Sequence, residues 1–321
     1  MSSLLNRIQT AYQQKLPFVA YRKPNTQVLQ AFFQQNDTLF FSEKFIESGF
    51  VFAPFNDANN AILIPNKHSH YLEEGLNLNS SFQEDRDACF TVQDLEAKKL
   101  HLQLIKKTIK AIKDHEFQKV VISRKEEIAL NDFDMIQTFK QLLNSYQNAF
   151  VSVWFHPKIG LWLGASPETL VRMNNSQFST MSLAGTQVFK NTESIVWENK
   201  ELEEQQLVTN FIESQLKPLV TTMKIGERTT LKAGTLMHLK TSITGVFDDQ
   251  KGDLKTFIKA LHPTPAVCGL PRDTSKKFIQ ANEHYQRTFY TGFLGELNLP
   301  SKTNTIKSSL FVNLRCMEIQ N

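Results

Sequence analysis

Residues 149–155 read Ala-Phe-Val-Ser-Val-Trp-Phe, and residues 160–165 read Gly-Leu-Trp-Leu-Gly-Ala. Both runs are short, apolar and rich in β-branched and aromatic side chains, so they predict two paired β-strands. The same reasoning predicts short strands within 1–90 and further strands at 119–123, 179–184, 236–247, 289–299 and 307–319. Helices are predicted at 94–115, 132–146, 193–216, 253–261 and 272–286. Strands come in runs with helices between the runs, which indicates an α+β fold with mainly antiparallel sheet.

The composition is that of an ordinary globular protein. The chain has 321 residues with no repeat and no Pro-rich or Ser-rich linker, so we expect a single domain over 1–321. Lys+Arg 36 against Asp+Glu 32 leaves a net charge of +4 without a basic stripe, so we expect no nucleic-acid partner. There is no signal-peptide pattern and no apolar run as long as a membrane span. We therefore expect a cytoplasmic monomer with no membrane partner.

Three cysteines, Cys89, Cys268 and Cys316, show no CxxC spacing, which argues against a zinc ribbon or a redox motif. Such a sparse, odd set fits a reducing compartment. No Walker loop, GxGxxG, GxSxG or HExxH pattern is present, so phosphate, dinucleotide, serine-hydrolase and zinc-protease chemistry all lack simple support.

The stretch 94–115 shows clear helical periodicity. Leu102, Ile105, Ile109 and Ile112 are spaced by three, four and three residues, and lysines fill the opposite face. This pattern predicts an amphipathic helix with a buried apolar face and a solvated lysine face.

Two residues stand out for acid–base chemistry. Lys119 enters the apolar run Lys-Val-Val-Ile-Ser, and burying an ammonium group is costly unless it is paired or deprotonated. It could be a general base, or a strand-edge lysine with its head group in water. Glu168 follows Gly164-Ala-Ser-Pro and could be a general acid, or the acidic residue of a first helical turn after proline.

Two more segments suggest a site. Lys200-Glu-Leu-Glu-Glu204 places several carboxylates in one helical turn, which is either a source of Mg²⁺ ligands or a solvated acidic face. Residues 261–271 read Leu-His-Pro-Thr-Pro-Ala-Val-Cys-Gly-Leu-Pro, and the three prolines stiffen this loop. Such a loop either lines a site or simply connects two elements.

Taken in order, these segments and four others resemble the chorismate-utilising enzymes, most closely isochorismate synthases. The resemblance covers about residues 118–318, and residues 1–93 match only as a variable N-terminal part before the conserved part at 94–321. The matching strings are Lys119-Val-Val-Ile-Ser-Arg, Gly164-Ala-Ser-Pro-Glu, Met181-Ser-Leu-Ala-Gly-Thr186, Lys200-Glu-Leu-Glu-Glu204, His238-Leu-Lys-Thr-Ser-Ile-Thr-Gly245, Leu261-His-Pro-Thr-Pro-Ala-Val-Cys-Gly269, Phe289-Tyr-Thr-Gly292 and Leu314-Arg-Cys316.

This resemblance implies a fold and an activity. The fold would be one α+β domain with two large packed antiparallel sheets, helices outside and the site between the sheets. The reaction would be the Mg²⁺-dependent conversion of chorismate and water to isochorismate, for menaquinone or siderophore synthesis. Lys119 would be the base that activates water, Glu168 the acid that protonates the departing hydroxyl, and Glu204 the Mg²⁺ ligand. The resemblance further implies that the substrate pocket is formed by Gly185, Thr186, His238, Ala266, Tyr290 and Arg315.

The resemblance also separates the subfamilies. Ammonia-using relatives such as anthranilate synthases carry Gln where Lys119 stands, and aminodeoxychorismate synthases carry a nucleophilic Lys where Ala184 stands, so water is favoured as the nucleophile. Salicylate synthases keep the lysine and then release pyruvate, but their loop tends to carry Thr at Ala266. Salicylate synthesis and a non-catalytic chorismate-binding remnant stay open as alternatives.

Two departures from the family pattern concern the metal. Gln205 stands where the family has His, and Glu203 beside Glu204 leaves two choices of ligand. Family chains also continue past Leu314-Arg-Cys316 with a strand, a Gly-rich turn and a helix that carries a second Mg²⁺ carboxylate. Since the sequence stops at Asn321, we expect that strand and helix to be missing, with weak Mg²⁺ binding and poor activity as the result.

Overall fold

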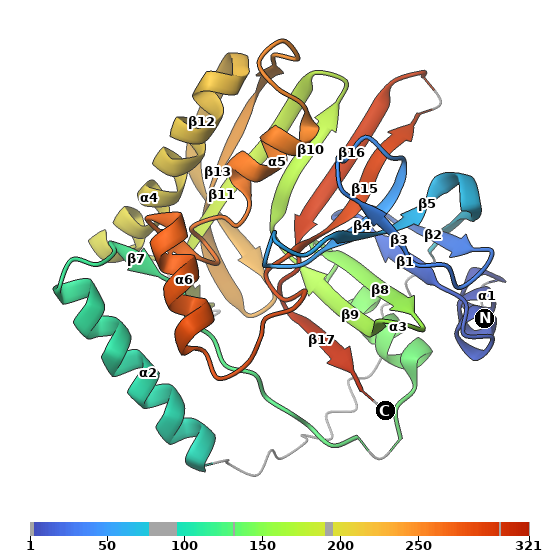
Figure 1. Cartoon of the computed structure of the whole chain (residues 1–321), viewed down its shortest axis with the longest axis horizontal. Helices are drawn as coiled ribbons and strands as arrows, with labels where there is room; N and C mark the ends of the chain where they lie inside the picture. The colour runs from blue at the N-terminus through green and yellow to red at the C-terminus, as the bar shows by residue number, and fades with distance from the viewer. Residues whose placement is uncertain (1–2, 77–94, 131, 190–194, 302, 321) are drawn as a thin grey trace. The chain divides into compact units, whose positions relative to one another are not determined.

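The computed structural model describes residues 3–76, 95–130, 132–189, 195–301 and 303–320 (Figure 1). The chain divides into two compact units. The first unit consists of Met1–Ser80, Asp134–His262 and Thr288–Asn321, and the second of Ser81–Phe133 and Pro263–Arg287. The single domain expected from the sequence stays a prediction. Among the described residues, every helix is too short or too polar to cross a lipid bilayer.

Two antiparallel sheets form the first unit, as the sequence predicted. The six-stranded sheet contains, in spatial order, β17 (Cys316–Ile319), β9 (Gly160–Ser166), β8 (Phe150–His156), β1 (Phe18–Arg22), β2 (Val28–Gln34) and β6 (Ser69–Gly75). The nine-stranded sheet contains β12 (Val220–Ala233), β13 (Leu236–Phe247), β11 (Gln177–Val188), β10 (Thr169–Asn174), β16 (Ile306–Val312), β15 (Phe293–Pro300), β4 (Gly49–Ala53), β5 (Ala61–Pro65) and β3 (Phe40–Ser42).

The two sheets pack face to face over an aromatic core. Strands β1 and β8 are buried along their whole length, because one face meets the other sheet and the second face lies beneath helices. Trp154 and Trp162 are cross-strand partners in the β8–β9 hairpin, so the predicted pairing of these two strands is confirmed. Phe150 of β8 stacks on Phe311 of β16 with ring centroids 4.1 Å apart, which joins the two sheets.

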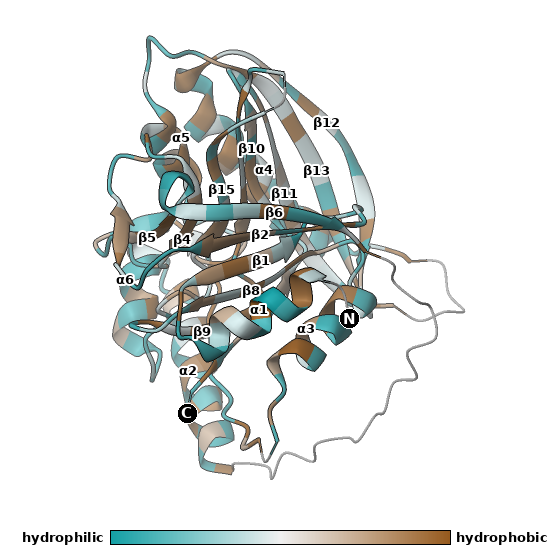
Figure 2. Cartoon of the chain, turned by 90° about the vertical axis from the view of Figure 1, so that its right-hand side faces the viewer, coloured by the Kyte–Doolittle hydropathy of each residue, from teal (hydrophilic) through white to brown (hydrophobic). Residues whose placement is uncertain are grey.

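Helices cover the outer faces of both sheets. Helices α1 (Ser3–Gln13) and α3 (Met135–Ser145) lie against β1 and β8, as Figure 2 shows. Helix α4 (Asn199–Leu216) packs on β11 and β13 of the other sheet and also contacts α5 (Leu254–Leu261). Two short 3₁₀ turns, η1 (Asn66–His68) and η2 (Lys217–Leu219), complete this unit.

The second unit is smaller and contains a two-stranded sheet. Strand β7 (Lys119–Val120) pairs with β14 (Gly269–Leu270) from the other segment of the unit. Its helices are α2 (Leu95–Lys113) and α6 (Arg272–Asn282). Phe117 and Phe278 meet edge to face with centroids 5.0 Å apart, which brings the end of α2 to α6.

The structure corrects the expected buried face of α2 and excludes one of the two interpretations of Glu168. It also contains elements that were not predicted, among them α1, β10 and β12. Helix α2 spans Leu95–Lys113, within the predicted range 94–115, but Leu102, Ile109 and Ile112 are exposed, because the side that packs carries Leu104 and Ala111. Glu168 begins no helix, since β9 ends at Ser166 and β10 begins at Thr169. Strand β12 was not predicted, because it is an edge strand whose side chains are largely exposed and polar.

One polar contact crosses the aromatic core. Tyr21 of β1 is fully buried, and its hydroxyl donates to Oε1 of Glu296 on β15 at 2.6 Å. The other oxygen of Glu296 meets the ammonium of Lys23 at 2.6 Å. Burial, together with the negative charge of Glu296, raises the pKa of Tyr21 well above its ordinary value, so the phenol stays protonated and remains a donor.

Replacing Tyr21 by Phe should lower the free energy of unfolding by about 1–3 kcal/mol, because Oε1 of Glu296 would stay buried without its donor. Tyr71→Phe is the matched control, since that hydroxyl accepts from Gln30 at the protein surface. The control should change stability by less than about 0.5 kcal/mol. Urea unfolding followed by tryptophan fluorescence measures both, and equal losses would contradict the assigned role of the buried contact.

Candidate functional site

A bulge in β11 lies at the centre of the predicted pocket. The β11–β13 register shifts between Ala184 and Thr186, and Gly185 between them has a φ of +71°. A β-carbon on Gly185 would come within 3.2 Å of the Cβ of Glu201 on α4 and within 3.3 Å of Leu239 on β13. Glycine at this position therefore permits both the left-handed backbone and the close approach of α4.

The bulge brings four predicted pocket residues together. Nδ1 of His238, on β13, lies 3.1 Å from Oγ1 of Thr186 and 3.3 Å from the carbonyl oxygen of Gly185. Arg315, just before β17, places Nη2 3.0 Å from Nε2 of His238. Its Nη1 donates to the carbonyl oxygen of Ala233 at 3.0 Å.

These contacts fix the protonation of His238. Arginine has only donors, so Nε2 must accept from Arg315, and the ring proton must lie on Nδ1, facing Gly185 and Thr186. Burial lowers the pKa of His238, the positive charge of Arg315 lowers it further, and the hydrogen bond to Gly185 acts in the opposite direction. The ring is therefore neutral at pH 7, and it holds the guanidinium in place without adding charge.

Arg315 and Tyr290 lie on two loops that are bonded to each other. Asn313 donates from its side chain to the carbonyl oxygen of Phe289 at 2.9 Å, and its own carbonyl accepts from the Thr291 backbone at 2.9 Å. Thr291 and Arg315 have φ values of 59° and 48°, a left-handed backbone that is uncommon outside glycine. Such strain persists only where surrounding contacts hold it, as these loop bonds do.

Glu168 is buried in the turn between β9 and β10, with 2% of its surface exposed. Its carbonyl oxygen accepts from the backbone of Val312 at 3.0 Å, and the hydroxyl of Ser166 donates to the carbonyl oxygen of the same valine. The turn is thus fixed to the end of β16. Of the two interpretations given above, a carboxyl in the first turn of a helix is excluded.

Helix α4 presents two carboxylates on one side. Glu201 and Glu204 are three residues apart and half-buried, whereas Glu203 points to solvent. Between the two alternatives left by the sequence, this exposure favours Glu204 over Glu203. Glu201 was not singled out by the sequence, although the spacing of three residues from Glu204 was a signal that could have found it.

A buried glutamine orients this helix. Gln205 is fully buried, and its Nε2 donates to Oγ of Ser182 at 2.8 Å and to Oγ1 of Thr241 at 2.9 Å. Its Oε1 accepts from Nε of Arg228 at 2.8 Å. Where family members carry His, this chain therefore uses an amide bonded to three strands, which sets the rotation of α4 and the direction of its carboxylates.

The donor set of α4 fits a divalent cation. Within the described part of the chain, Oε2 of Glu201 is buried and has no hydrogen-bond partner, which is costly for a carboxylate oxygen unless a cation accompanies it. The described residues contain no ready-made cluster of three His, Cys, Asp or Glu side chains. Glu201 and Glu204 would thus supply one or two carboxylates, the arrangement in which Mg²⁺ keeps several water or substrate oxygens.

A cavity of about 280 Å³ in the first unit lies apart from these residues. It is bounded by α5, by the β4–β5 loop and by Phe293, and it contains none of the predicted site residues. The geometry of the bulge, and not this cavity, carries the functional argument.

In the second unit, Lys119 is 9% exposed and begins β7. Its carbonyl oxygen accepts from the hydroxyl of Ser275 at 3.0 Å. A β-carbon on Gly269 would lie 2.2 Å from that oxygen, so only glycine allows β14 to pair here. Lys119 is therefore a buried residue in a short strand, as the interpretation of a general base required.

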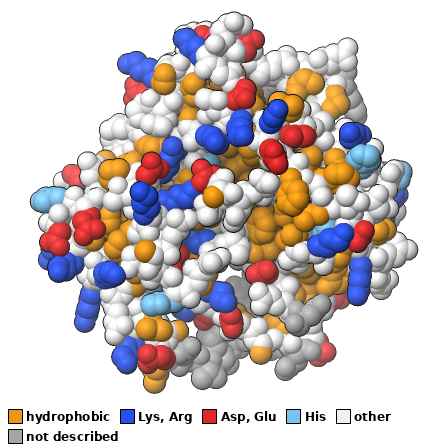
Figure 3. All heavy atoms as spheres, in the orientation of Figure 1, with side chains coloured by type: hydrophobic (Ala, Val, Ile, Leu, Met, Phe, Trp, Pro, Cys, Tyr) orange, Lys and Arg blue, Asp and Glu red, His pale blue; other side chains and the backbone are white. Residues whose placement is uncertain are grey.

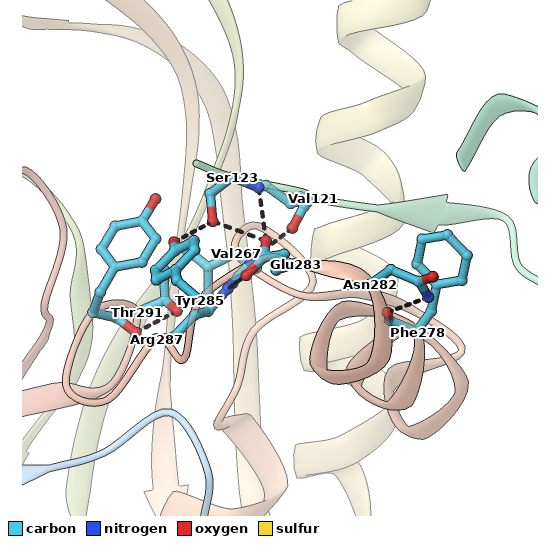
Figure 4. A network of polar contacts seen from close by, with 10 residues as sticks. Val121, Ser123, Val267, Phe278, Asn282, Glu283, Tyr285, Arg287 and Thr291 are labelled. Atoms are coloured by element: carbon cyan, nitrogen blue, oxygen red, sulfur yellow. Dashed lines mark hydrogen bonds and ion pairs between the residues drawn. The ribbon is translucent and has the colours of Figure 1, made fainter. Parts of the chain in front are cut away.

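The backbone hydrogen bonds between the β7 and β14 segments end at Val121. A buried ion pair holds the segment that follows Val121 (Figure 4). Arg287 meets Glu283 at 2.6 Å, with 3% and 1% of the side chains exposed. The guanidinium also donates to the carbonyl oxygens of Val121 and Val267, at 2.7 and 2.8 Å. Glu283 in turn accepts from the backbone and the hydroxyl of Ser123, at 2.7 and 2.9 Å. This pair, which the sequence did not reveal, joins the segment after Lys119 to the loop that carries Ala266.

The predicted residues are thus divided between the units. Gly185, Thr186, His238 and Arg315 are in one bonded group, and Glu168, Glu204 and Tyr290 belong to the same unit. Lys119 and Ala266 belong to the second unit.

Comparisons with known proteins show the family and the fold. A family model described as "Chorismate binding enzyme" matches residues 46–321, and the chain therefore belongs to the chorismate-binding enzyme family. Isochorismate synthase DhbC of Bacillus subtilis is 34% identical over 142 residues, which are 41% of this chain and 36% of that protein. The salicylate biosynthesis isochorismate synthase of Pseudomonas aeruginosa is 31% identical over 201 residues, 59% of this chain and 41% of that one.

Solved structures share the fold over nearly the whole chain. The menaquinone-specific isochorismate synthase MenF of Escherichia coli superposes with a TM-score of 0.75 at 20% identity, covering 100% of this chain and 83% of that one. The DhbC structure from Bacillus anthracis gives 0.74 at 19% identity, covering 99% and 90%. In sequence, by contrast, the matched segments span less than half of the two curated relatives above.

Replacing Arg287 by Met should cost about 3–5 kcal/mol of unfolding free energy, because Glu283 would be left as an uncompensated buried charge. Lys125→Met, which breaks an exposed pair with Glu127 in the same unit, is the control and should cost less than about 1 kcal/mol. Amide hydrogen exchange offers a local readout, since the Ser123 amide should lose protection in the Arg287 variant. A Ser123 amide that stays protected would show that the pair does not hold this segment.

Proposed function

We propose that this protein is a Mg²⁺-dependent isochorismate synthase, which converts chorismate and water to isochorismate and water. The observation that carries the proposal is the bonded group of Thr186, His238 and Arg315 around the Gly185 bulge. This group fixes the guanidinium of Arg315 beside the neutral His238 ring and the Thr186 hydroxyl. A cation beside neutral polar groups suits a substrate with carboxylates and hydroxyl groups. The two curated relatives and the two solved structures described above are all named isochorismate synthases, which supports the same reaction.

Arg315 would bind a carboxylate of chorismate. The guanidinium has five N–H donors, and its contacts with Ala233 and His238 orient the plane while leaving donors for an anion. Because His238 is neutral, it does not compete with the guanidinium for that carboxylate. Tyr290, on the loop bonded to the Arg315 loop, would form part of the same pocket.

The reaction needs a base and an acid. Lys119 would take a proton from water as the water oxygen bonds to ring C2, and the ring double bonds shift as the C4–O bond breaks. Glu168 would donate a proton so that the C4 hydroxyl leaves as water, since hydroxide is a poor leaving group. One proton is accepted and one is donated, so the exchange with solvent restores both groups.

Glu204 and Glu201 would hold the Mg²⁺. When bound, the ion would neutralise and orient a substrate carboxylate. Gln205 would act as a positioning residue for both ligands, since its bonds to the sheet set the rotation of α4.

Water is proposed as the nucleophile because of Lys119 and Ala184. Lys119 is positioned on a buried strand, where ammonia-using relatives carry Gln. Ala184 is itself buried at the edge of the bulge, and it supplies no amine where another subfamily uses a nucleophilic lysine. The proposal concerns the reaction and its product, which either menaquinone or siderophore synthesis can consume.

The first test is chromatography of chorismate after incubation with the protein and Mg²⁺, with EDTA as a control. An isochorismate peak that EDTA abolishes is expected.

Lys119→Ala and Glu168→Gln should each lower kcat by about 10²–10⁴-fold, the usual contribution of general acid–base groups. Lys125→Ala and Glu227→Gln, both exposed, should leave turnover unchanged. Salicylate together with pyruvate would move the protein to the salicylate synthases, and full activity of either site variant would refute its role.

Metal binding gives a readout that does not depend on turnover. Calorimetric titration of EDTA-stripped protein with Mg²⁺ should show weaker binding for Glu204→Gln and Glu201→Gln, by about tenfold or more for each lost carboxylate. Glu203→Gln is the matched control on the same helix and should bind like the unchanged protein. Equal binding by all four proteins would place the metal elsewhere.

A further inference from the structure

One side of helix α2 carries apolar residues that face water. Leu95, Leu102 and Ile109 are 70%, 48% and 48% exposed, and Ile112 is 37% exposed. Seven residues are almost two turns of an α-helix, so the first three lie in one line along it. The packed side of the helix is different, since it carries Leu104, Thr108 and Ala111.

Lysines flank this line on both sides. Four residues before and after Leu102 stand Lys98 and Lys106, each about 40° around the helix from it. The only acidic residue of the helix is Glu96. The lysines of the helix are Lys98, Lys99, Lys106, Lys107, Lys110 and Lys113. In Figure 3 blue side chains, with some red ones among them, lie at the lower left of the view, where Figure 1 draws α2.

We propose that this face of α2 binds the surface of an anionic lipid bilayer. Apolar side chains in a line would enter the boundary between head groups and acyl chains, and the flanking ammonium groups would reach the lipid phosphates. Each lysine near such a surface adds to the attraction, while Glu96 within the helix and the exposed Asp114 and Glu116 directly after its end oppose it.

The composition of the face favours lipid over protein. Protein interfaces are enriched in aromatic residues and arginine and depleted in lysine, whereas α2 contains no Phe, Tyr, Trp or Arg and has six lysines. A second copy of the chain would set lysine rows against lysine rows, a like-charge contact. The inference does not rest on the proposed reaction, because it uses none of the site residues.

The test is flotation of the full-length protein with vesicles. One set contains equal parts of phosphatidylglycerol and phosphatidylcholine, and the other contains phosphatidylcholine alone. The protein should float with the anionic vesicles only, and 0.5 M salt should release most of it, because salt screens the lysine contribution.

Two variants separate the contributions of α2. Lys106→Gln with Lys110→Gln should weaken binding by about thirty-fold, as expected for two lysines at an anionic surface. Lys217→Gln with Lys224→Gln removes the same charge from exposed positions in the first unit, and should change binding by less than about twofold. Leu102→Gln with Ile109→Gln keeps the charge and should also weaken binding clearly, since it removes the apolar line.

Three results would overturn the proposal. The first is equal flotation with neutral and anionic vesicles. The second is an equal loss of vesicle binding in the Lys106/Lys110 and the Lys217/Lys224 variants, and the third is no flotation at all. If vesicles fail but the protein self-associates in sedimentation, and Leu102→Gln with Ile109→Gln abolishes that association, the face belongs to a second copy. Circular dichroism confirms that each variant is folded, which is expected because the changed side chains are exposed.

Discussion

The absence of a side chain at Gly185 is the constraint on which the hydrogen-bonded group of Thr186, His238 and Arg315 depends. A β-carbon there would press on α4 and on β13, so a larger residue would require both to shift and would also strain the left-handed backbone. The same residue turns the backbone into a bulge, and the bulge directs the Gly185 carbonyl and the Thr186 hydroxyl at His238. The histidine then fixes Arg315, which comes from a loop far along the chain. One glycine thus determines where a helix, two strands and a loop meet.

Much of the fold could be predicted from local sequence. The β8–β9 pair was predicted because apolar, β-branched and aromatic residues are concentrated where both faces of a strand are buried. Strand β12 was missed because an exposed edge strand has no such concentration. The buried face of α2 was assigned incorrectly, because the apolar periodicity of Leu102, Ile109 and Ile112 says that a helix has two faces but not which of them meets the protein.

The site was predictable only where a short string carried it. Gly185, Thr186, His238 and Arg315 lie in strings that resemble a known family, and the fold brings these four into contact. The Glu283–Arg287 pair had no such signal, and Gln205 was noted only as a departure from the family pattern, because a buried amide and a buried ion pair look like ordinary surface residues in sequence. Their roles follow from partners up to 166 residues away, which only the tertiary fold defines.

The second unit is made of two separate stretches of the chain, and this has a consequence for its biosynthesis. Ser123 finds its partner, Glu283, only 160 residues later, and β7 pairs with a strand from the same late stretch. During synthesis the backbone of β7 therefore stays unpaired until the segment that ends at Arg287 has left the ribosome. Most of the strands of the larger unit have emerged by then. The pairing of β7 with β14 therefore forms late in synthesis, and until then the backbone of Lys119 and Val120 has no strand partner.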